Sequence, residues 1–229
     1  MEPSHEEEGN PSTEEGVEFL SEKGAPLRQV QLRSDPQVYC RCYCEENVLR
    51  LAAHSSMAAH LESLHMLLIS SPAKSVLMLR QQAGQASALQ HVVWDYHVLL
   101  LTPELVYDLD TTLPFPSATA AYFAASFMPC RPELSPCFRL LSLAEYTAHF
   151  SSDRRHMLDS SGQYQAPPPP WPPIRGTAAA SEHSLPLLLS MGEGEGAGAA
   201  AGRVFHAVPD LLAALAAGSA QSAAATVAQ

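Results

Sequence analysis

The segment from Gln90 to Leu101 restricts the fold more than any other part of this sequence. It is the strongest predicted strand, and it contains the run Trp94-Asp95-Tyr96-His97-Val98. Thr102-Pro103-Glu104 is typical of a turn, and Leu105 to Asp110 is predicted to return as a second strand. We therefore expect a β-hairpin that offers a histidine on one strand to carboxylates on the other.

Alternate side chains along a strand share a face. On the first strand this places His97 with Asp95 on one face and Trp94 with Tyr96 on the other. We interpret the two aromatic residues as core residues and expect His97 to point away from them.

The partner of His97 depends on the register of the hairpin. A hairpin that closes symmetrically about Thr102-Pro103 places Asp108 opposite His97, with Cβ atoms about 5 Å apart. If Pro103 instead takes the second position of a type I turn, Asp110 lies opposite His97. The residues alone leave both carboxylates as candidates for orienting the imidazole.

Cys44 is the candidate nucleophile among three closely spaced cysteines. It lies at the N-terminus of a predicted helix that runs from Glu45 onward, whereas Cys40 and Cys42 precede that helix. A helix N-terminus and a nearby imidazolium both lower the pKa of a thiol and so favour the reactive thiolate. The carboxylates of Glu45 and Glu46 oppose this ionisation, and the histidine has to override them.

These features also have structural interpretations. A lone histidine in an apolar strand is more often a core residue than a catalyst. A metal ion could be coordinated by Cys40, Cys42 and Cys44 together with histidines. However, structural zinc sites usually use Cys-x2-Cys pairs, and no second pair exists here.

The remaining predicted elements mix helices and strands and indicate an α+β fold. Strands are predicted at His65 to Ser70, Ser75 to Leu79 and Phe138 to Leu141, and helices at Ala118 to Phe127 and Ser142 to Phe150, the latter with a capping box between Ser142 and Glu145. The proline run from Pro167 to Pro173 must be extended.

Composition predicts one domain with two disordered ends. Residues 1–35 hold many of the acidic residues and few large apolar ones, so we expect a disordered acidic tail. Residues 36–215 form the expected single domain, with a flexible Gly/Ala insert at 192–202. Residues 216–229 are predicted to be a disordered Ala-rich tail.

Charge and hydropathy exclude several kinds of partner. The sequence contains no basic stripe of the kind that binds nucleic acid. None of its apolar stretches is long enough to span a bilayer. The N-terminus has neither the charge nor the apolar run of a secretory signal. We expect a soluble monomer in the cytosol or nucleus, with reduced cysteines.

Taken together, several motifs occur in the order found in one known family. They are Cys42-Tyr43-Cys44-Glu45-Glu46-Asn47, Gln81-Gln82-Ala83, Trp94 to Val98, Tyr107-Asp108-Leu109-Asp110, Leu113-Pro114-Phe115-Pro116, Ser152-Asp153-Arg154, His156-Met157, Asp159-Ser160-Ser161-Gly162 and Pro167 to Pro170. Over roughly Tyr39 to Ile174 the chain closely resembles the protein N-terminal glutamine amidohydrolase family, which carries the WDYHV motif. The match is weaker towards the C-terminus. There Leu185 to Met191 looks like the last strand of that family, and Val204 to Leu212 looks like its last helix.

The resemblance implies an α/β fold like that of papain-type and transglutaminase-type thiol enzymes. It implies a triad of Cys44 as nucleophile, His97 as base and acid, and Asp108 as orienting carboxylate, and so favours the register that pairs His97 with Asp108. The implied substrates are proteins or peptides with N-terminal glutamine, deamidated to glutamate through a thioester without metal or cofactor. This reaction feeds the arginylation branch of N-terminus-dependent protein degradation.

Two other functions use the same residues. A papain-like cysteine peptidase has the same triad but releases peptides, and a zinc-binding interaction module uses the cysteines as ligands. For the deamidation function, some group must recognise the α-ammonium group of the substrate, and a buried acid would serve. Asp95 and Asp110 are the two hypotheses for it, and structural hydrogen bonding is the alternative role of each.

Overall fold

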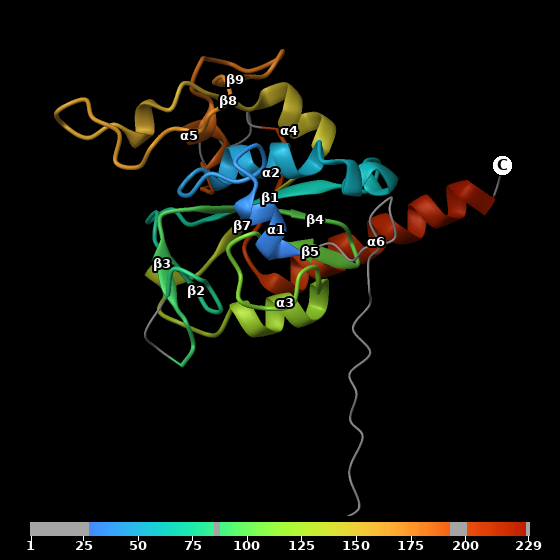
Figure 1. The fold of residues 1–229 in the computed structure, drawn as a ribbon. Helices are drawn as coiled ribbons and strands as arrows, with labels where there is room; N and C mark the ends of the chain where they lie inside the picture. The colour runs from blue at the N-terminus through green and yellow to red at the C-terminus, as the bar shows by residue number, and fades with distance from the viewer. Residues whose placement is uncertain (1–27, 85–87, 193–200, 228–229) are drawn as a thin grey trace, which may run out of the picture.

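A six-stranded antiparallel sheet forms the centre of the computed structural model, which describes residues 28–84, 88–192 and 201–227 (Figure 1). In spatial order its strands are β10 (Arg203–Phe205), β7 (Cys137–Ser142), β1 (His65–Ser70), β4 (His97–Leu101), β5 (Leu105–Tyr107) and β6 (Ser117–Ala118). Helices flank the sheet, which confirms the predicted α+β class. The likeness to papain-type and transglutaminase-type enzymes stays a prediction.

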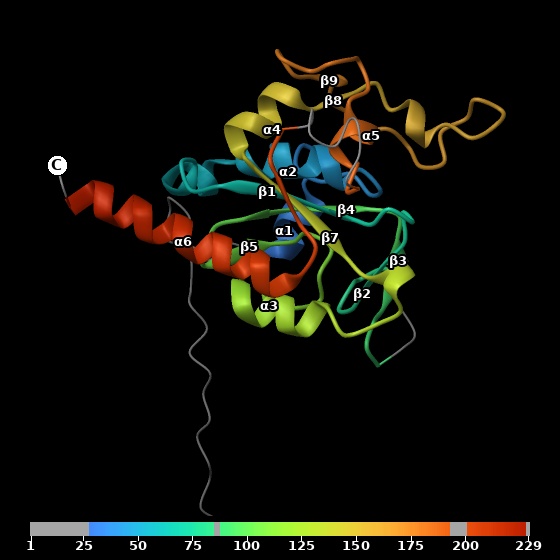
Figure 2. The same cartoon turned by 180° about the vertical axis from the view of Figure 1, so that it is seen from behind.

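Helices cover both faces of this sheet. Helices α2 (Cys44–Ala52) and α4 (Leu143–His149) lie on one face, and α3 (Thr119–Ser126) and α6 (Val208–Val227) lie on the other (Figures 1 and 2). Each face therefore buries its own hydrophobic cluster against the sheet.

The alternation of β4 shows how the two clusters share one strand. Val98 and Leu100 pack in the cluster with α2, whereas Leu99 and Leu101 pack in the cluster with α3. A strand that is apolar on both faces has to be central, and β4 lies between β1 and β5. His97, the first residue of β4, is thereby fixed at the end of the best-buried part of the sheet.

Smaller elements surround this core. The pairs β2 (Val76–Met78) with β3 (Val92–Trp94) and β8 (Ser151–Ser152) with β9 (Ile174–Arg175) each form a two-stranded sheet. Short 3-10 helices lie at Ser55–His60, Pro132–Leu134 and Arg155–Met157. The predicted capping box is confirmed, since Ser142 caps α4 and the Glu145 side chain returns to the Ser142 backbone.

The predicted strand from Gln90 to Leu101 is wrong as one continuous element. The chain bends at Asp95, so β3 pairs with β2 in a separate sheet and only β4 joins the central one. Strand alternation does not cross such a bend, which matters for the orientation of His97 described below.

The register of the hairpin also differs from the one that the resemblance favoured. Leu100 pairs with Tyr107 and Leu101 with Val106, which is the register that would place Asp110 opposite His97. The reason is the turn: Thr102 N–H donates to the Leu105 carbonyl and Thr102 Oγ1 accepts from the Leu105 N–H, so these two residues close the hairpin. The ladder ends at Tyr107, before either carboxylate.

Within the described residues, parts of both predicted tails are helical. Helix α1 (Gln29–Ser34) lies inside the predicted acidic tail, and α6 runs to Val227 through the predicted Ala-rich tail. Leu32 of α1 is buried in the core, and alanine has the highest helix propensity, so apolar anchoring and propensity outweigh the compositional signal. Residues 1–27 and most of the predicted insert, 193–200, lie outside the described residues.

The C-terminal elements differ from the prediction too. Leu185 to Met191, expected as a strand, contains α5 (Leu185–Leu188), and the last strand is β10, just before α6. Ser184 and Pro186 at the start of α5 favour a helix over a strand, because proline cannot donate to a ladder but fits the first helical turn. Among the described residues, no helix has the length and apolar character needed to cross a bilayer.

Candidate active site

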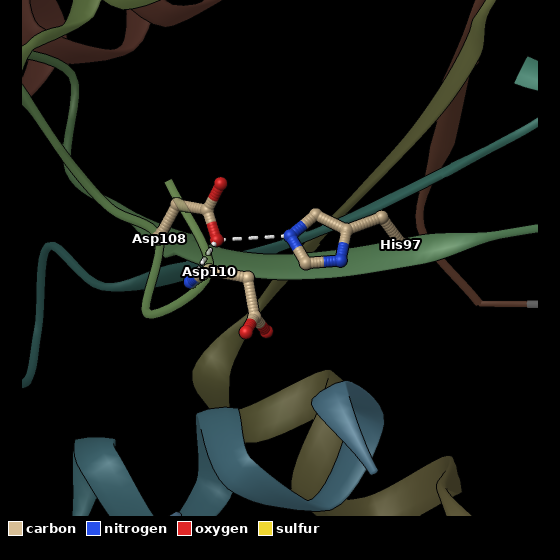
Figure 3. Close-up of side chains that lie close together, drawn as sticks. All are labelled: His97, Asp108 and Asp110. Carbon is tan, nitrogen blue, oxygen red and sulfur yellow. Dashed lines mark hydrogen bonds and ion pairs between the residues drawn. The ribbon is translucent and has the colours of Figure 1, made fainter. Parts of the chain in front are cut away.

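His97 and Asp108 form a buried pair at the end of β4. His97 Nε2 and Asp108 Oδ1 are 2.9 Å apart, and both side chains are almost fully buried. Figure 3 shows the imidazole edge directed at this carboxylate, with the Asp110 side chain pointing away from the bond. The carboxylate partner implied by the resemblance is therefore the one that contacts His97, although the hairpin register is the other one.

Asp108 reaches His97 because it lies in the turn that follows β5. Its Oδ1 also accepts the Asp110 N–H at 2.9 Å, which is the bond of an Asx turn, and its Oδ2 accepts the Tyr122 hydroxyl at 2.8 Å and the Gln81 amide at 3.2 Å. Burial raises the pKa of Asp108, but His97 and these donors together hold the pKa below its ordinary value. Asp108 is therefore a fixed negative charge.

The pKa of His97 reflects the same pairing. Burial lowers it, but the charge of Asp108 and the hydrogen bond to it, with smaller contributions from Asp110 and Glu45, raise the pKa above its ordinary value. Nε2 is engaged with Asp108, and among the described residues Nδ1 has no hydrogen-bond partner. The imidazole thus keeps one nitrogen for chemistry.

The expectation that Trp94 and Tyr96 point away from His97 is wrong for Trp94. The Trp94 and His97 rings stack, with centroids 5.9 Å apart and planes 16° from parallel. The bend at Asp95 turns β3 so that Trp94 covers the imidazole, and Trp94 Nε1 donates to Gln81, which in turn holds Asp108. Both aromatic residues are only partly buried, so neither is a simple core residue.

Cys44 begins α2, as predicted, and faces the strand that carries His97. The backbone of Val98, the residue after His97, favours the ionised form of the sulfur and so acts to lower the pKa of Cys44. The expected lowering of the thiol pKa is wrong. Burial, followed by the charge of Glu45, raises the pKa of Cys44 well above its ordinary value. Cys44 is therefore a thiol that needs a base, and His97 lines the same cavity.

One cavity of about 770 Å³ joins these residues. Cys44, His97, Trp94, Tyr96 and Asp95 line it, together with Cys42, Asp110, Arg33, Tyr39, Arg41, Lys74, Gln82, Ala83, Val92, His156, Met157, Gln165, His183, Leu185, Pro186 and Leu189. A cavity of this size accommodates a small molecule or the end of a peptide chain. It presents the thiol and the imidazole to the same bound group.

A second polar cluster behind Cys44 was missed by sequence reasoning. Glu45 is fully buried, and its carboxylate lies 3.7 Å from the Cys44 sulfur, 3.1 Å from the Tyr96 hydroxyl and 3.2 Å from His156 Nε2. The His156 ring stacks on that of His183. His156 and Tyr96 occur in the matching motifs, but only the fold shows that they meet at Glu45.

Helix α1 holds the loop after β5 in place. Gln29 donates to the carbonyls of Asp108, Leu109 and Thr111. Arg33 forms an ion pair with Asp110 at 2.7 Å, and the Tyr39 hydroxyl donates to the same carboxylate at 2.6 Å. The segment predicted to be a disordered tail therefore supports the carboxylate side of the site.

The start of α2 is fixed by a buried ion pair. Arg154 donates to Glu46 through Nε at 2.9 Å and Nη2 at 2.8 Å, and the Trp171 indole donates to the same carboxylate at 2.7 Å. Arg154 also donates to the carbonyls of Pro169 and Trp171, so the proline run is tied to α2. The matching motif Ser152-Asp153-Arg154 is thus partly an anchor for α2.

We expect Arg154→Met to destabilise the fold strongly, because it leaves the Glu46 carboxylate buried without its cation. Removing one partner of a buried pair costs about 3–5 kcal/mol. Urea unfolding of the full chain measures the change in the free energy of unfolding. Arg175→Met is the matched control, since the Arg175–Glu182 pair is exposed. A loss below about 1 kcal/mol for Arg154→Met would contradict this account.

Candidate metal ligands gather around the histidine rather than the cysteines. Among the residues that the structure describes, the one group of three or more such side chains is His97, Asp108 and Asp110, whose ligand atoms lie within 4.8 Å of one another. Cys40 instead contacts the Pro167 carbonyl through its sulfur, and Cys42 is exposed. The described residues therefore give no support to a zinc clip built from the three cysteines.

Comparison with known proteins identifies the family of this chain. A family model described as N-terminal glutamine amidase matches residues 39–209. The chain is also 40% identical over 146 residues to proteins named protein N-terminal glutamine amidohydrolase from Drosophila melanogaster, Drosophila erecta and Drosophila mojavensis. The match covers 59% of this chain and 71% of each relative. The chain therefore belongs to the N-terminal glutamine amidase family.

Proposed function

We propose that this protein is a thiol hydrolase that converts an N-terminal glutamine of a protein or peptide into glutamate and releases ammonia. The observation that carries the proposal is the cavity that Cys44 and His97 share, with His97 bonded to Asp108 behind it. Membership of the family supports the substrate, since the relatives carry this activity in their names.

The first half of the reaction forms a thioester. His97 Nδ1 takes the proton of the Cys44 thiol as the sulfur attacks the side-chain amide carbon of the bound glutamine. Asp108 holds the tautomer that leaves Nδ1 free and stabilises the imidazolium that forms. The carbonyl oxygen becomes negatively charged, and the free N–H groups of the first turn of α2 are suited to stabilise it. His97 then protonates the nitrogen, and ammonia leaves.

The second half hydrolyses the thioester. His97, again neutral, takes a proton from water as the water oxygen attacks the thioester carbon. The carbon–sulfur bond breaks, the proton returns to Cys44, and the product carries an N-terminal glutamate. Every proton in this cycle moves through His97. A product with an N-terminal glutamate suits the arginylation branch of N-terminus-dependent degradation. We assign the reaction to that pathway.

The experiment that tests this function measures ammonia release from two peptides of equal composition. One starts with glutamine, and the other carries glutamine at an internal position. We expect release from the first and not from the second, because the cavity receives a chain end. Shorter peptides in place of ammonia would show a papain-like peptidase instead, and the absence of both products would exclude a thiol hydrolase of either kind.

A further inference from the structure

A terminal glutamine differs from an internal one by its α-ammonium group. Only a few single bonds separate that nitrogen from the side-chain amide carbon, so the ammonium group must lie close to Cys44 during the reaction. Selection for chain ends therefore calls for a negatively charged acceptor on the wall of the same cavity. This inference rests on the proposed function and names the residue that supplies its specificity.

Two carboxylates line the cavity, Asp95 and Asp110. Asp110 is already engaged: Arg33 lies 2.7 Å from its Oδ1, and the Tyr39 hydroxyl donates to the same oxygen at 2.6 Å. A substrate cation there would have to compete with a guanidinium that neutralises the carboxylate. The geometry makes Asp110 part of the framework rather than a free acceptor.

Asp95 has the properties that Asp110 lacks. It lies in the bend between β3 and β4, two residues before His97, and its side chain is exposed at the cavity. Its Oδ1 accepts the N–H of Tyr96, and among the described residues no cation pairs with it. The Ser70 hydroxyl donates to the Asp95 carbonyl at 2.7 Å, so the backbone that presents this carboxylate is anchored to β1.

We propose that Asp95 binds the α-ammonium group of the substrate and thereby restricts the reaction to N-terminal glutamine. The bend that interrupts the predicted strand is what allows this. The bend at Asp95 breaks the strand alternation that would put Asp95 and His97 on one face, and both side chains line the cavity. His97 acts on the side-chain amide, and Asp95 holds the other end of the same residue.

The contact between Asp95 and the ammonium group also affects the Cys44 thiol, because negative charges surround the sulfur. Burial and then the negative charges of Glu45, Asp110 and Asp95 act against ionisation of Cys44. An ammonium group bound at Asp95 offsets part of that negative charge, so the thiolate forms more readily when a chain terminus is in place. In the free enzyme the Cys44 thiol is protonated, and a substrate that carries an ammonium group promotes ionisation of this thiol. Both effects favour terminal glutamine over internal glutamine.

The test compares two peptides that differ only in the ammonium group. The first starts with glutamine, and in the second a 4-carbamoylbutanoyl cap keeps the side-chain amide but replaces the amino group by hydrogen. We expect Asp95→Asn to lower kcat/KM for the first peptide about 10- to 100-fold and to leave the second unchanged, as for loss of one charged hydrogen bond. The amide oxygen introduced by this substitution keeps an acceptor for the Tyr96 N–H. Asp153→Asn, whose carboxylate does not line the cavity, is the matched control.

Calorimetry adds a readout that does not depend on turnover. A peptide that starts with norvaline has the ammonium group but no amide, and its binding should weaken by a similar factor in Asp95→Asn and not in Asp153→Asn. An equal loss for both peptides in the rate assay, unchanged binding of the norvaline peptide, or a selective loss in Asp110→Asn instead would overturn the proposal. Failure of the unmodified chain to release ammonia from the glutamine peptide would contradict the proposed function itself.

Discussion

Replacing Cys44 by alanine is expected to lower ammonia release from a glutamine-starting peptide by about 10⁶-fold, the loss typical of removing a catalytic nucleophile. Cys44 is the thiol at the start of α2, whereas Cys42, which lines the same cavity, precedes that helix. Cys44 is partly exposed to the cavity, and its side chain is small, so the variant should stay folded. Ammonia release under saturating peptide, together with an unchanged circular dichroism spectrum, measures both points.

Cys42→Ala is the matched control for this prediction. Cys42 lines the same cavity two residues away but precedes α2, and its backbone has a positive φ of 69°. We expect this variant to retain activity within a few-fold. Full activity in Cys44→Ala with loss in Cys42→Ala would move the nucleophile to Cys42 and refute the assignment.

Asp108→Asn should lower the rate by about 10⁴-fold, because an amide can hold the wrong tautomer of the imidazole. It should also shift the pH dependence. In the native protein the base form of His97 is required, so kcat/KM rises with pH through a pKa that lies above the ordinary histidine value. Without the Asp108 charge, burial lowers the pKa of His97 with less opposition, and the acidic limb moves to lower pH. The pH profile of kcat/KM measures this shift.

Asp153→Asn provides the comparison for the pH profile. Asp153 pairs with Arg155 and lies 3.8 Å from His183 Nδ1, and within the described residues none of these three is a hydrogen-bond partner of the His97 or Asp108 side chain. The acidic limb should stay in place in this variant. An acidic limb that also stays in place in Asp108→Asn would show that the group titrating in the native profile is not a histidine paired with Asp108.

Much of the fold follows from local sequence signals. The strand at His65–Ser70, the helix that contains Cys44 at its start and the capping box at Ser142 all agree with the prediction, because each depends on residues within a few positions. The site residues were predictable in part for the same reason. Cys44 could be placed by its position at a helix start, whereas the choice of Asp108 over Asp110 came from the family resemblance.

The orientation of the histidine could not be predicted from strand alternation. The bend at Asp95 depends on the pairing of β3 with β2, which lies earlier in the chain, and this long-range pairing turns Trp94 onto His97. Similarly, the ladder between β4 and β5 stops at Tyr107, so Asp108 reaches His97 from a turn and not from an opposed strand position. Counting residues across a hairpin gives the right answer only where the ladder continues.

Electrostatics around the thiol were the least predictable part. The position of Cys44 at a helix N-terminus suggested an acidic thiol, but the fold buries Glu45 beside the sulfur and adds Tyr96 and His156 behind it. Burial and carboxylate charge outweigh the helix dipole, which contributes only a few tenths of a kcal/mol to about 1 kcal/mol at an exposed site. Three segments far apart in the sequence meet at that carboxylate, and no local pattern reports it.

The most direct test of the account follows one glutamine-starting peptide by mass spectrometry in water enriched in oxygen-18. Hydrolysis of a thioester at the side chain predicts an intact backbone and a gain of about 3 Da, since one amino group is exchanged for a hydroxyl that carries the heavy isotope. The new mass should locate to the first residue. A peptide of unchanged mass, or one cleaved at a backbone bond, would contradict the claim that this chain deamidates N-terminal glutamine.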